Sequence, residues 1–229
     1  MTVITISRQF GSGGDEVAEQ VCSLLGYKYL DKWLMQNVAV EVGLSPDEVV
    51  DFSEDHYKAR TFLQSLFGPR SRTVTQVSSR TRTTTGETRT NVVRLDEAQC
   101  IDLIRVAVVA AYKRGNIVIV GRGSQAILAD RPDVLHVRIE APLELRMQRI
   151  SQQENMTLVE ARALIGQRDF AAAQYLERFF GIDWNDPLHY TLVINTGKCS
   201  YDTAARIIVD AARHLEQEFQ PAAREATPS

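Results

Sequence analysis

The segment Val3-Ile-Thr-Ile-Ser-Arg-Gln-Phe-Gly-Ser-Gly-Gly-Asp-Glu-Val-Ala18 decides the fold of this chain. Its first part is a β-branched apolar run typical of a buried strand, and a helical pattern follows over 15–25. The glycines between the two can adopt positive φ and let an anion approach peptide N–H groups, and a helix N-terminus adds its positive dipole end. We therefore favour a phosphate-binding loop over a plain strand-to-helix turn. The loop would consist of Gly11, Ser12, Gly13 and Gly14.

Gly14 stands where the Walker A pattern of phosphate-binding loops has its lysine. Arg8, three residues before Gly11, is the nearest candidate for the missing positive charge. Asp15 and Glu16 follow in the first turn of the expected helix. Their carboxylates can cap free backbone N–H groups, or they can contact a Mg²⁺ ion that lies against bound phosphates. The sequence leaves both interpretations open.

The length and composition indicate a globular chain of one or two domains. A chain of 229 residues with 44% hydrophobic content can bury one sizeable core. Its net charge of -3 argues against bulk electrostatic attachment to nucleic acid or to a membrane surface. No apolar run approaches the roughly 18–20 residues that a membrane-spanning helix needs. Since the N-terminus also shows no signal-peptide pattern, we expect a cytoplasmic protein whose 3 cysteines are buried free thiols.

Short apolar segments alternate with longer segments of helical period along the chain. This alternation predicts a parallel sheet with helices on both faces, in a three-layer α/β/α arrangement. We expect a single domain over 1–219 and a frayed tail over 220–229. The predicted strands cover 3–7, 27–30, 116–121, 134–139 and 190–195, and the predicted helices cover 15–25, 96–114, 143–153, 158–168 and 200–219.

An insert over about 56–94 differs from the rest of the chain. Between Lys58 and Arg94 it carries eight basic side chains and a single acid, Glu87, together with many threonines and serines. It is predicted to form either a small β element or a loop that orders on binding. Such a concentrated basic patch is either a solvated arm or a surface that faces phosphate or nucleic acid.

Four blocks of sequence resemble nucleoside monophosphate kinases of the P-loop class, and most closely the cytidylate kinase-like proteins. The first block, Ile4–Gly14, looks like that subfamily's lysine-free loop, and the second, Leu25–Asp31, is similar to the start of its monophosphate site. The third, Val118–Gly123, matches the strand that ends in Gly-Arg-Asp in cytidylate kinases. The fourth looks like a lid and its flanking helices; it consists of Arg146-Met-Gln-Arg149, Gln167-Arg-Asp169 and the strand end Asn195-Thr196.

The resemblance implies a P-loop fold with a basic insert at the monophosphate site and a helical lid over about 146–180. Besides the glycine loop with Asp15 and Glu16, the donor ATP would contact Arg146, Asn195 and Thr196. The acceptor would contact Asp31, Arg60, Arg122 and Asp169, although Asp169 could instead orient a lid arginine. We expect four arginines to act on the transferred phosphoryl group, because a guanidinium carries a permanent charge and a fixed fork of donors. These are Arg8, Arg122, Arg149 and Arg168.

The sequence thus favours a Mg²⁺-dependent kinase that moves the γ-phosphate of ATP to CMP, dCMP or a related small acceptor. One alternative is a nucleotide-binding regulatory module that has lost its chemistry, because Gly14 replaces a lysine and Val120 and Gly123 occupy positions where cytidylate kinases carry aspartates. A second, less favoured alternative is a polyanion or nucleic-acid binder that uses the basic insert. An apolar helical face over 103–109 leaves a homo-oligomer open.

Overall fold

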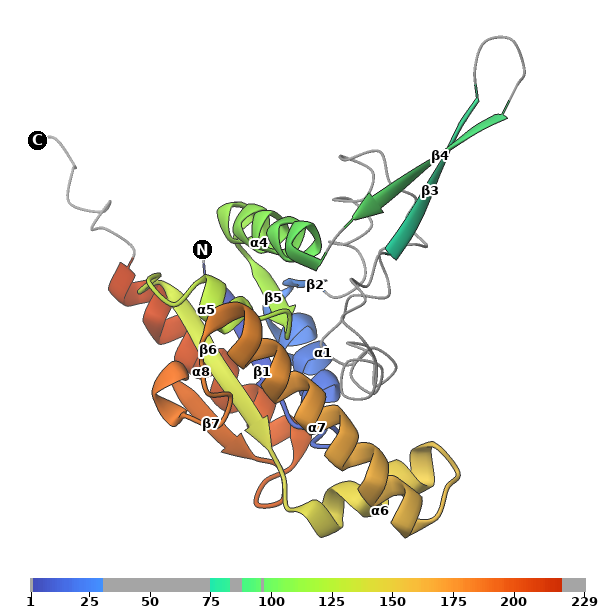
Figure 1. Cartoon of the computed structure of the whole chain (residues 1–229). Coiled ribbons are helices and arrows are strands. Elements are labelled where there is room, and N and C mark those ends of the chain that lie inside the picture. Colours follow the sequence, from blue (N-terminus) through green and yellow to red (C-terminus); the bar gives the residue numbers. More distant parts are fainter. Residues whose placement is uncertain (1, 31–74, 83–87, 96, 220–229) are drawn as a thin grey trace, which may run out of the picture.

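The computed structural model describes residues 2–30, 75–82, 88–95 and 97–219. Its centre is a five-stranded sheet of order β2-β5-β1-β6-β7 in which all neighbouring strands are parallel (Figure 1). The predicted parallel sheet is confirmed, and each strand lies within two residues of its predicted bounds. The strands are β1 (Val3–Arg8), β2 (Lys28–Leu30), β5 (Ile117–Val120), β6 (Val134–Glu140) and β7 (Leu192–Asn195).

Helices cover both faces of this sheet because its inner strands are apolar on both sides. Ile4 and Ile6 of β1 pack with α1 (Gly14–Leu25) and α8 (Tyr201–Phe219). Val3 points to the opposite face, where it packs with α4 (Glu97–Arg114), α5 (Ser124–Ile127) and α7 (Leu158–Phe180). Successive side chains of a strand point to opposite faces, so a continuous apolar strand needs a helical layer on each. The three-layer α/β/α prediction is therefore confirmed.

The region predicted as the lid is a pair of helices, α6 (Leu143–Gln153) and α7. The predicted capping box is present, since the Thr157 hydroxyl accepts from the Glu160 N–H and the Glu160 carboxylate accepts from the Thr157 N–H. The prediction that this helix ends at 168 was wrong, because α7 continues to Phe180. It ends where Gly181 adopts φ 68°, a conformation that glycine accepts without strain.

Part of the insert has a described backbone. Strands β3 (Thr75–Arg82) and β4 (Thr88–Leu95) pair antiparallel in a sheet of their own, which Figure 1 shows projecting from the three-layer body. This hairpin is the β element that was one of the two alternatives for the insert. Asp31 and Arg60, predicted at the acceptor, and the tail over 220–229 lie outside the described residues. No described helix is long and apolar enough to cross a bilayer.

A buried arginine ties the segment after α7 to the sheet. Arg138 of β6 is 1% exposed, and its guanidinium lies 4.4 Å from the ring centre of Trp184 and 5.4 Å from that of Tyr190. It donates to the Trp184 carbonyl and to the Glu140 carboxylate. The Trp184 indole N–H donates to the Ser7 hydroxyl at 2.8 Å. Because a buried charge must be paired and hydrogen-bonded, these contacts fix the C-terminal end of the lid on the sheet.

His136 of β6 is a buried titratable group in the same sheet. Its Nδ1 lies 2.7 Å from the Thr5 hydroxyl of the neighbouring strand. Burial lowers the pKa of His136, because desolvation disfavours the charged imidazole. The folded state therefore binds fewer protons at this site than the unfolded state. The contribution of His136 to stability is present above the unfolded pKa of about 6.5 and is lost as the pH falls below it.

We expect His136→Asn to lower stability at pH 7.5 by about 1 kcal/mol, the usual net value of one hydrogen bond. The variant should lose less stability than the wild type between pH 7.5 and pH 5.5, because it no longer carries a depressed imidazole. Thermal unfolding at the two pH values measures the difference. The exposed His214→Asn is the control and should keep the wild-type pH dependence. Equal pH dependence for His136→Asn and the wild type would contradict the prediction.

Candidate functional site

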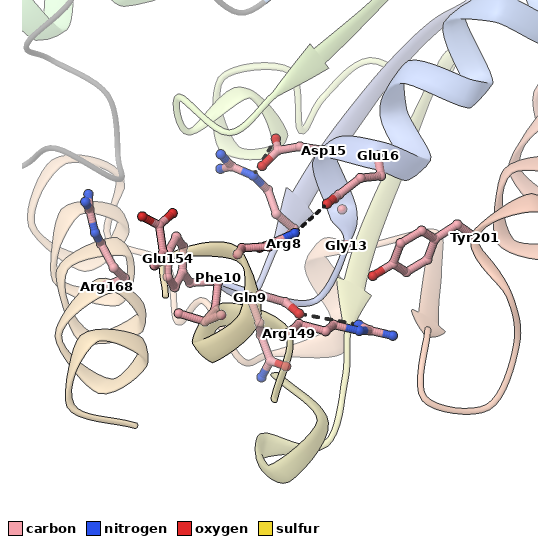
Figure 2. A pocket seen from close by; sticks show the side chains of 14 residues that line it. Arg8, Gln9, Phe10, Gly13, Asp15, Glu16, Arg149, Glu154, Arg168 and Tyr201 are labelled. Carbon is pink, nitrogen blue, oxygen red and sulfur yellow. Dashed lines mark hydrogen bonds and ion pairs between the residues drawn. The ribbon is translucent and has the colours of Figure 1, made fainter. Parts of the chain in front are cut away.

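A cavity of about 240 Å³ lies at the carboxyl end of β1, between the start of α1 and the two lid helices (Figure 2). Ligands of open parallel sheets bind at this edge. Figure 2 shows Arg168 on one side of the cavity and Tyr201 on the other, with Arg8, Gln9 and Gly13 between them. Its lining residues are Arg8, Gln9, Phe10, Gly11, Gly13, Gly14, Asp15, Glu16, Arg149, Ile150, Gln153, Glu154, Arg168 and Tyr201.

The glycine-rich loop forms one wall of this cavity. Gly11 and Gly13 adopt φ 78° and 81°, in the left-handed region that side chains rarely enter. Gly13 is the N-cap of α1 and supplies no side chain to the first free N–H groups of that helix. Ser12 is fully buried, and its hydroxyl has no hydrogen-bond partner among the described residues. The loop therefore presents backbone donors to the cavity, as an anion site requires.

Arg8 lies against Gly14, at the position of the missing lysine. A Cβ atom on Gly14 would approach Arg8 Cγ to 2.8 Å and Arg8 Cβ more closely still. The methylene stem of Arg8 thus occupies the space that any side chain at 14 would need. Arg8 Nε donates to the Asp15 carboxylate at 3.2 Å, and the same carboxylate oxygen accepts from the Tyr29 hydroxyl at 3.2 Å. Arg8 thus brings a positive charge to the loop from the preceding strand.

Arg149 of α6 holds the loop from the opposite side. Its Nη1 donates to the Ser12 carbonyl at 3.0 Å and to the Gly11 carbonyl at 3.4 Å, while both Nη atoms contact Thr196. The Thr196 hydroxyl also donates to the Ser12 carbonyl, at 2.5 Å. The guanidinium lies 5.0 Å from the ring centre of Tyr201. Arg149 was predicted at the transferred phosphoryl group and Thr196 near the donor; both fix the shape of the loop through its carbonyls.

Three of the four arginines expected to converge line this one cavity: Arg8, Arg149 and Arg168. Arg168 lies 5.6 Å from the ring centre of Phe10. Arg122, which follows β5, is 6% exposed and is not among the described residues that line the cavity. The structure places it at the carboxyl edge of the sheet, on the α5 side.

Arg146 and Asp169 lie behind the loop. Arg146 is 7% exposed, and its Nη1 contacts Asp169 Oδ2 at 2.6 Å. Neither residue lines the cavity, whereas we expected Arg146 at the donor phosphates and named Asp169 for the acceptor. The alternative for Asp169, that it orients a lid arginine, describes the contact that the structure shows.

The remaining predicted donor-side residues have distinct places. Asp15 and Glu16 line the cavity, and Glu16 accepts a long hydrogen bond of 3.4 Å from Gln153. Their carboxylates and the oxygens of a phosphate are the hard ligands that Mg²⁺ prefers, so these residues fit that ion. Among the described residues, no group of three or more His, Cys, Asp or Glu side chains is arranged so that it could hold a metal ion by itself. Asn195 is exposed, and its side-chain oxygen accepts from the Gly197 N–H at 2.8 Å.

Sequence reasoning missed several residues of the site. The ring of Tyr201 lies against Gly13, where an added Cβ would meet its hydroxyl at 2.5 Å, and burial raises the pKa of that phenol. Gln9 accepts from the Ala141 N–H at 3.2 Å and joins the loop to the start of the lid. The position of Gln9 and Phe10 just before Gly11 was an available signal. Nothing in the sequence places Tyr201 beside Gly13.

The sheet, the glycine loop after β1 and the two lid helices define a P-loop kinase fold. Among solved structures, an uncharacterized protein from Eubacterium ventriosum superposes with a TM-score of 0.61 at 20% identity, covering 93% of this chain and 99% of that one. A gluconokinase from Sinorhizobium meliloti 1021 superposes with a TM-score of 0.51 at 10% identity, covering 96% and 98%. At these identities the likeness shows the fold alone.

The model of the cytidylate kinase-like family matches residues 3–198, and the chain belongs to this family. A cytidylate kinase from Pyrococcus horikoshii is 25% identical over 215 residues, which is 93% of this chain and 90% of that protein. A second, from Pyrococcus furiosus, is 32% identical over 108 residues, 47% and 55% of the two chains. Family and fold together place the chain among the nucleotide-binding kinases.

The contact between Arg8 and Gly14 generates a test of the lysine-free loop. We expect Gly14→Ala to lower the free energy of unfolding by about 1–3 kcal/mol, the usual cost of an overpacked site. In an Arg8→Gly background Gly14→Ala should cost much less, because glycine at position 8 removes both clashing atoms, Cβ and Cγ. Chemical denaturation of the single and double variants measures the coupling.

Gly166→Ala on α7 is the matched control for this test. A Cβ there meets nothing within 4 Å, so the change should stabilise the helix by about 0.5–1 kcal/mol. If Gly14→Ala behaved in the same way as Gly166→Ala, the space at 14 would be open and the prediction wrong.

Proposed function

We propose that this protein is a nucleoside monophosphate kinase that transfers the γ-phosphate of ATP to CMP, dCMP or a similar small acceptor. The observation that carries the proposal is the cavity in which Arg8, Arg149 and Arg168 come together beside an uncapped helix N-terminus. Membership of the cytidylate kinase-like family supports the choice of acceptor class.

Each residue of the site has a role in this proposal. The backbone N–H groups of the loop hold the donor phosphates, and Arg8 replaces the lysine that the loop lacks. Arg168 reaches the transferred group from the lid, while Arg149 keeps the loop carbonyls turned away from the phosphates through the hydrogen bonds that it donates. Arg122, at the carboxyl edge of the sheet, is the proposed contact of the acceptor phosphate.

Asp15 and Glu16 would hold Mg²⁺ together with the donor phosphates. When bound, this ion supplies positive charge to the phosphate oxygens. The Asp15 carboxylate would then contact both Mg²⁺ and Arg8, because it already accepts a hydrogen bond from Arg8. The Tyr29 hydroxyl, which donates to the same oxygen, keeps the carboxylate beside the loop.

Phosphoryl transfer requires the chain to align the two substrates and to stabilise the charge of the moving group. An oxygen of the acceptor phosphate attacks the γ-phosphorus, the new P–O bond forms, and the bond to the bridging oxygen breaks with release of ADP. No side chain acts as a nucleophile. Guanidinium groups suit this task because they keep their charge and offer several donors in a fixed plane.

A specific contact favours the alternative of a regulatory nucleotide-binding module. Arg8 is paired with Asp15, so its charge is partly neutralised before any phosphate arrives. If this pair persists when ATP binds, the loop holds nucleotide with too little positive charge for transfer. ATP would then raise the melting temperature by mass action without turnover.

We expect Arg8→Ala and Arg168→Ala each to lower kcat/KM for transfer at least about tenfold, which corresponds to the loss of about 1.4 kcal/mol of transition-state stabilisation. Arg8→Lys should retain more activity than Arg8→Ala, because it keeps the charge. A coupled assay of ADP formation with ATP, Mg²⁺ and a panel of nucleoside monophosphates measures transfer.

Arg206→Ala is the control for these variants, because Arg206 is 64% exposed on α8 and forms its ion pair with Asp202, away from the cavity. It should leave transfer unchanged. A wild-type protein that transfers phosphate to no acceptor of the panel, yet gains thermal stability from ATP, would replace the kinase proposal by the regulatory one.

A further inference from the structure

Phe10, the residue directly before the glycine loop, is part of the core of the lid. Its ring packs with Ile150 of α6 and with Ala161 and Ile165 of α7. The next residue, Gly11, approaches α6 so closely that an added Cβ would lie 2.9 Å from Ile150 Cγ1. The phosphate-binding loop therefore begins inside the helical pair that also forms the lid.

The peptide groups of Phe10 are held on both sides by one ion pair. The Phe10 N–H donates to Asp169 Oδ1 at 2.9 Å, and the Phe10 carbonyl accepts from Arg146 Nη1 at 3.2 Å. Arg146 Nη1 also donates to Asp169 Oδ2 at 2.6 Å, and Arg146 Nε donates to the Ala141 carbonyl at 3.1 Å. Arg146 lies on α6 and Asp169 on α7, so the pair joins both lid helices to the residue directly before the loop.

Burial and charged hydrogen bonds keep Arg146 and Asp169 in this geometry. Arg146 is 7% exposed and its donors go to two carbonyls and a carboxylate. Hydrogen bonds to ionised groups are stronger than neutral ones, and removal of one partner of a buried pair leaves an uncompensated charge. The lid cannot shift relative to Phe10 without breaking these contacts.

The pair also places a residue of the cavity. Arg168 precedes Asp169 on α7 and lies 5.6 Å from the ring centre of Phe10, with its side chain lining the cavity. Asp169 and Arg146 themselves do not line it. Both residues thus influence the site through the loop backbone and through the position of α7.

We propose that Arg146 and Asp169 are positioning residues, which clamp the phosphate-binding loop to the lid through the peptide groups of Phe10. Loop and lid then form one unit, and the shape in which the loop receives donor phosphates depends on this pair. The proposal rests on the proposed function for the identity of the donor. The clamp itself is a property of the ligand-free chain.

The test uses Asp169→Asn and Arg146→Lys in the full chain. Asn keeps an acceptor for the Phe10 N–H but loses the charge, and lysine cannot bridge the Ala141 and Phe10 carbonyls and Asp169 at once, because it is a point donor. The matched controls are Asp202→Asn and Arg206→Lys, which alter an ion pair of the same residue types that is 62% and 64% exposed. Thermal unfolding checks that each variant is folded. If Asp169→Asn does not fold, Arg146→Lys carries the test.

Hydrogen exchange of the Phe10 amide is the first readout. In the ligand-free protein each clamp variant should exchange this amide at least about tenfold faster than the wild type, a change that corresponds to about 1.4 kcal/mol. The controls should leave the exchange rate unchanged. Wild-type exchange rates at Phe10 in both clamp variants would overturn the proposal.

Substrate dependence is the second readout, and it separates a positioning role from a direct contact. We expect the Kd for ADP, measured by calorimetry, and the KM for ATP to rise at least threefold in the clamp variants, while the KM for the acceptor stays within twofold of the wild type. An equal rise of the acceptor KM would show that Asp169 contacts the acceptor, and would overturn the proposal. If the wild type transfers no phosphate but exchange and ADP binding change as expected, the clamp stands and the proposed reaction falls.

Discussion

The close approach of Arg8 to Gly14 is the contact on which the candidate site depends. The methylene stem of Arg8 lies where position 14 would otherwise carry a Cβ, so the loop has room for the cation from β1 and none for one of its own. With Arg8 in place of a side chain at position 14, a positive group still lies next to the first turn of α1. This arrangement also brings Asp15, the nearest acid, into contact with that group. In the proposed site Arg8 would stand in for the lysine that the loop lacks.

The other arginines of the site differ in where their guanidinium groups point: some donate to the chain, and some line the cavity. Arg149 gives hydrogen bonds to the loop carbonyls and to Thr196, yet its side chain lines the cavity. Arg146, three residues earlier on the same helix, donates instead to the Ala141 and Phe10 carbonyls and to Asp169. Arg168 approaches from α7. Guanidinium groups can do both tasks because each offers five donors in one plane.

The sequence predicts the layers of the fold well, because buried parallel strands are nearly continuous apolar runs. It also predicts the turn after β1, because glycines are the residues that adopt positive φ without strain. It predicts the site less completely. Arg146 and Arg149 lie one turn apart, so periodicity puts both on one helix face and cannot say which reaches the cavity. The burial of Arg138 depends on Trp184 and Tyr190, far along the chain. Such long-range pairings leave no local signal in the sequence.

The fixed points of α7 limit how the lid can move. At its C-terminal end, Phe180 lies against Gly123, and Trp184 just beyond it is hydrogen-bonded to Ser7. In the middle of the helix, Asp169 accepts a hydrogen bond from the Phe10 N–H. The half of α7 that precedes Asp169 is about 16 Å long at 1.5 Å per residue. Because Phe180 is also held, only a bend at Asp169 is open to the helix: a bend of about 10° there moves Leu158 by about 3 Å, and Arg168, one residue away, by a fraction of that distance. Such a bend would move the N-terminal end of α7 while Arg168 keeps its place at the cavity wall.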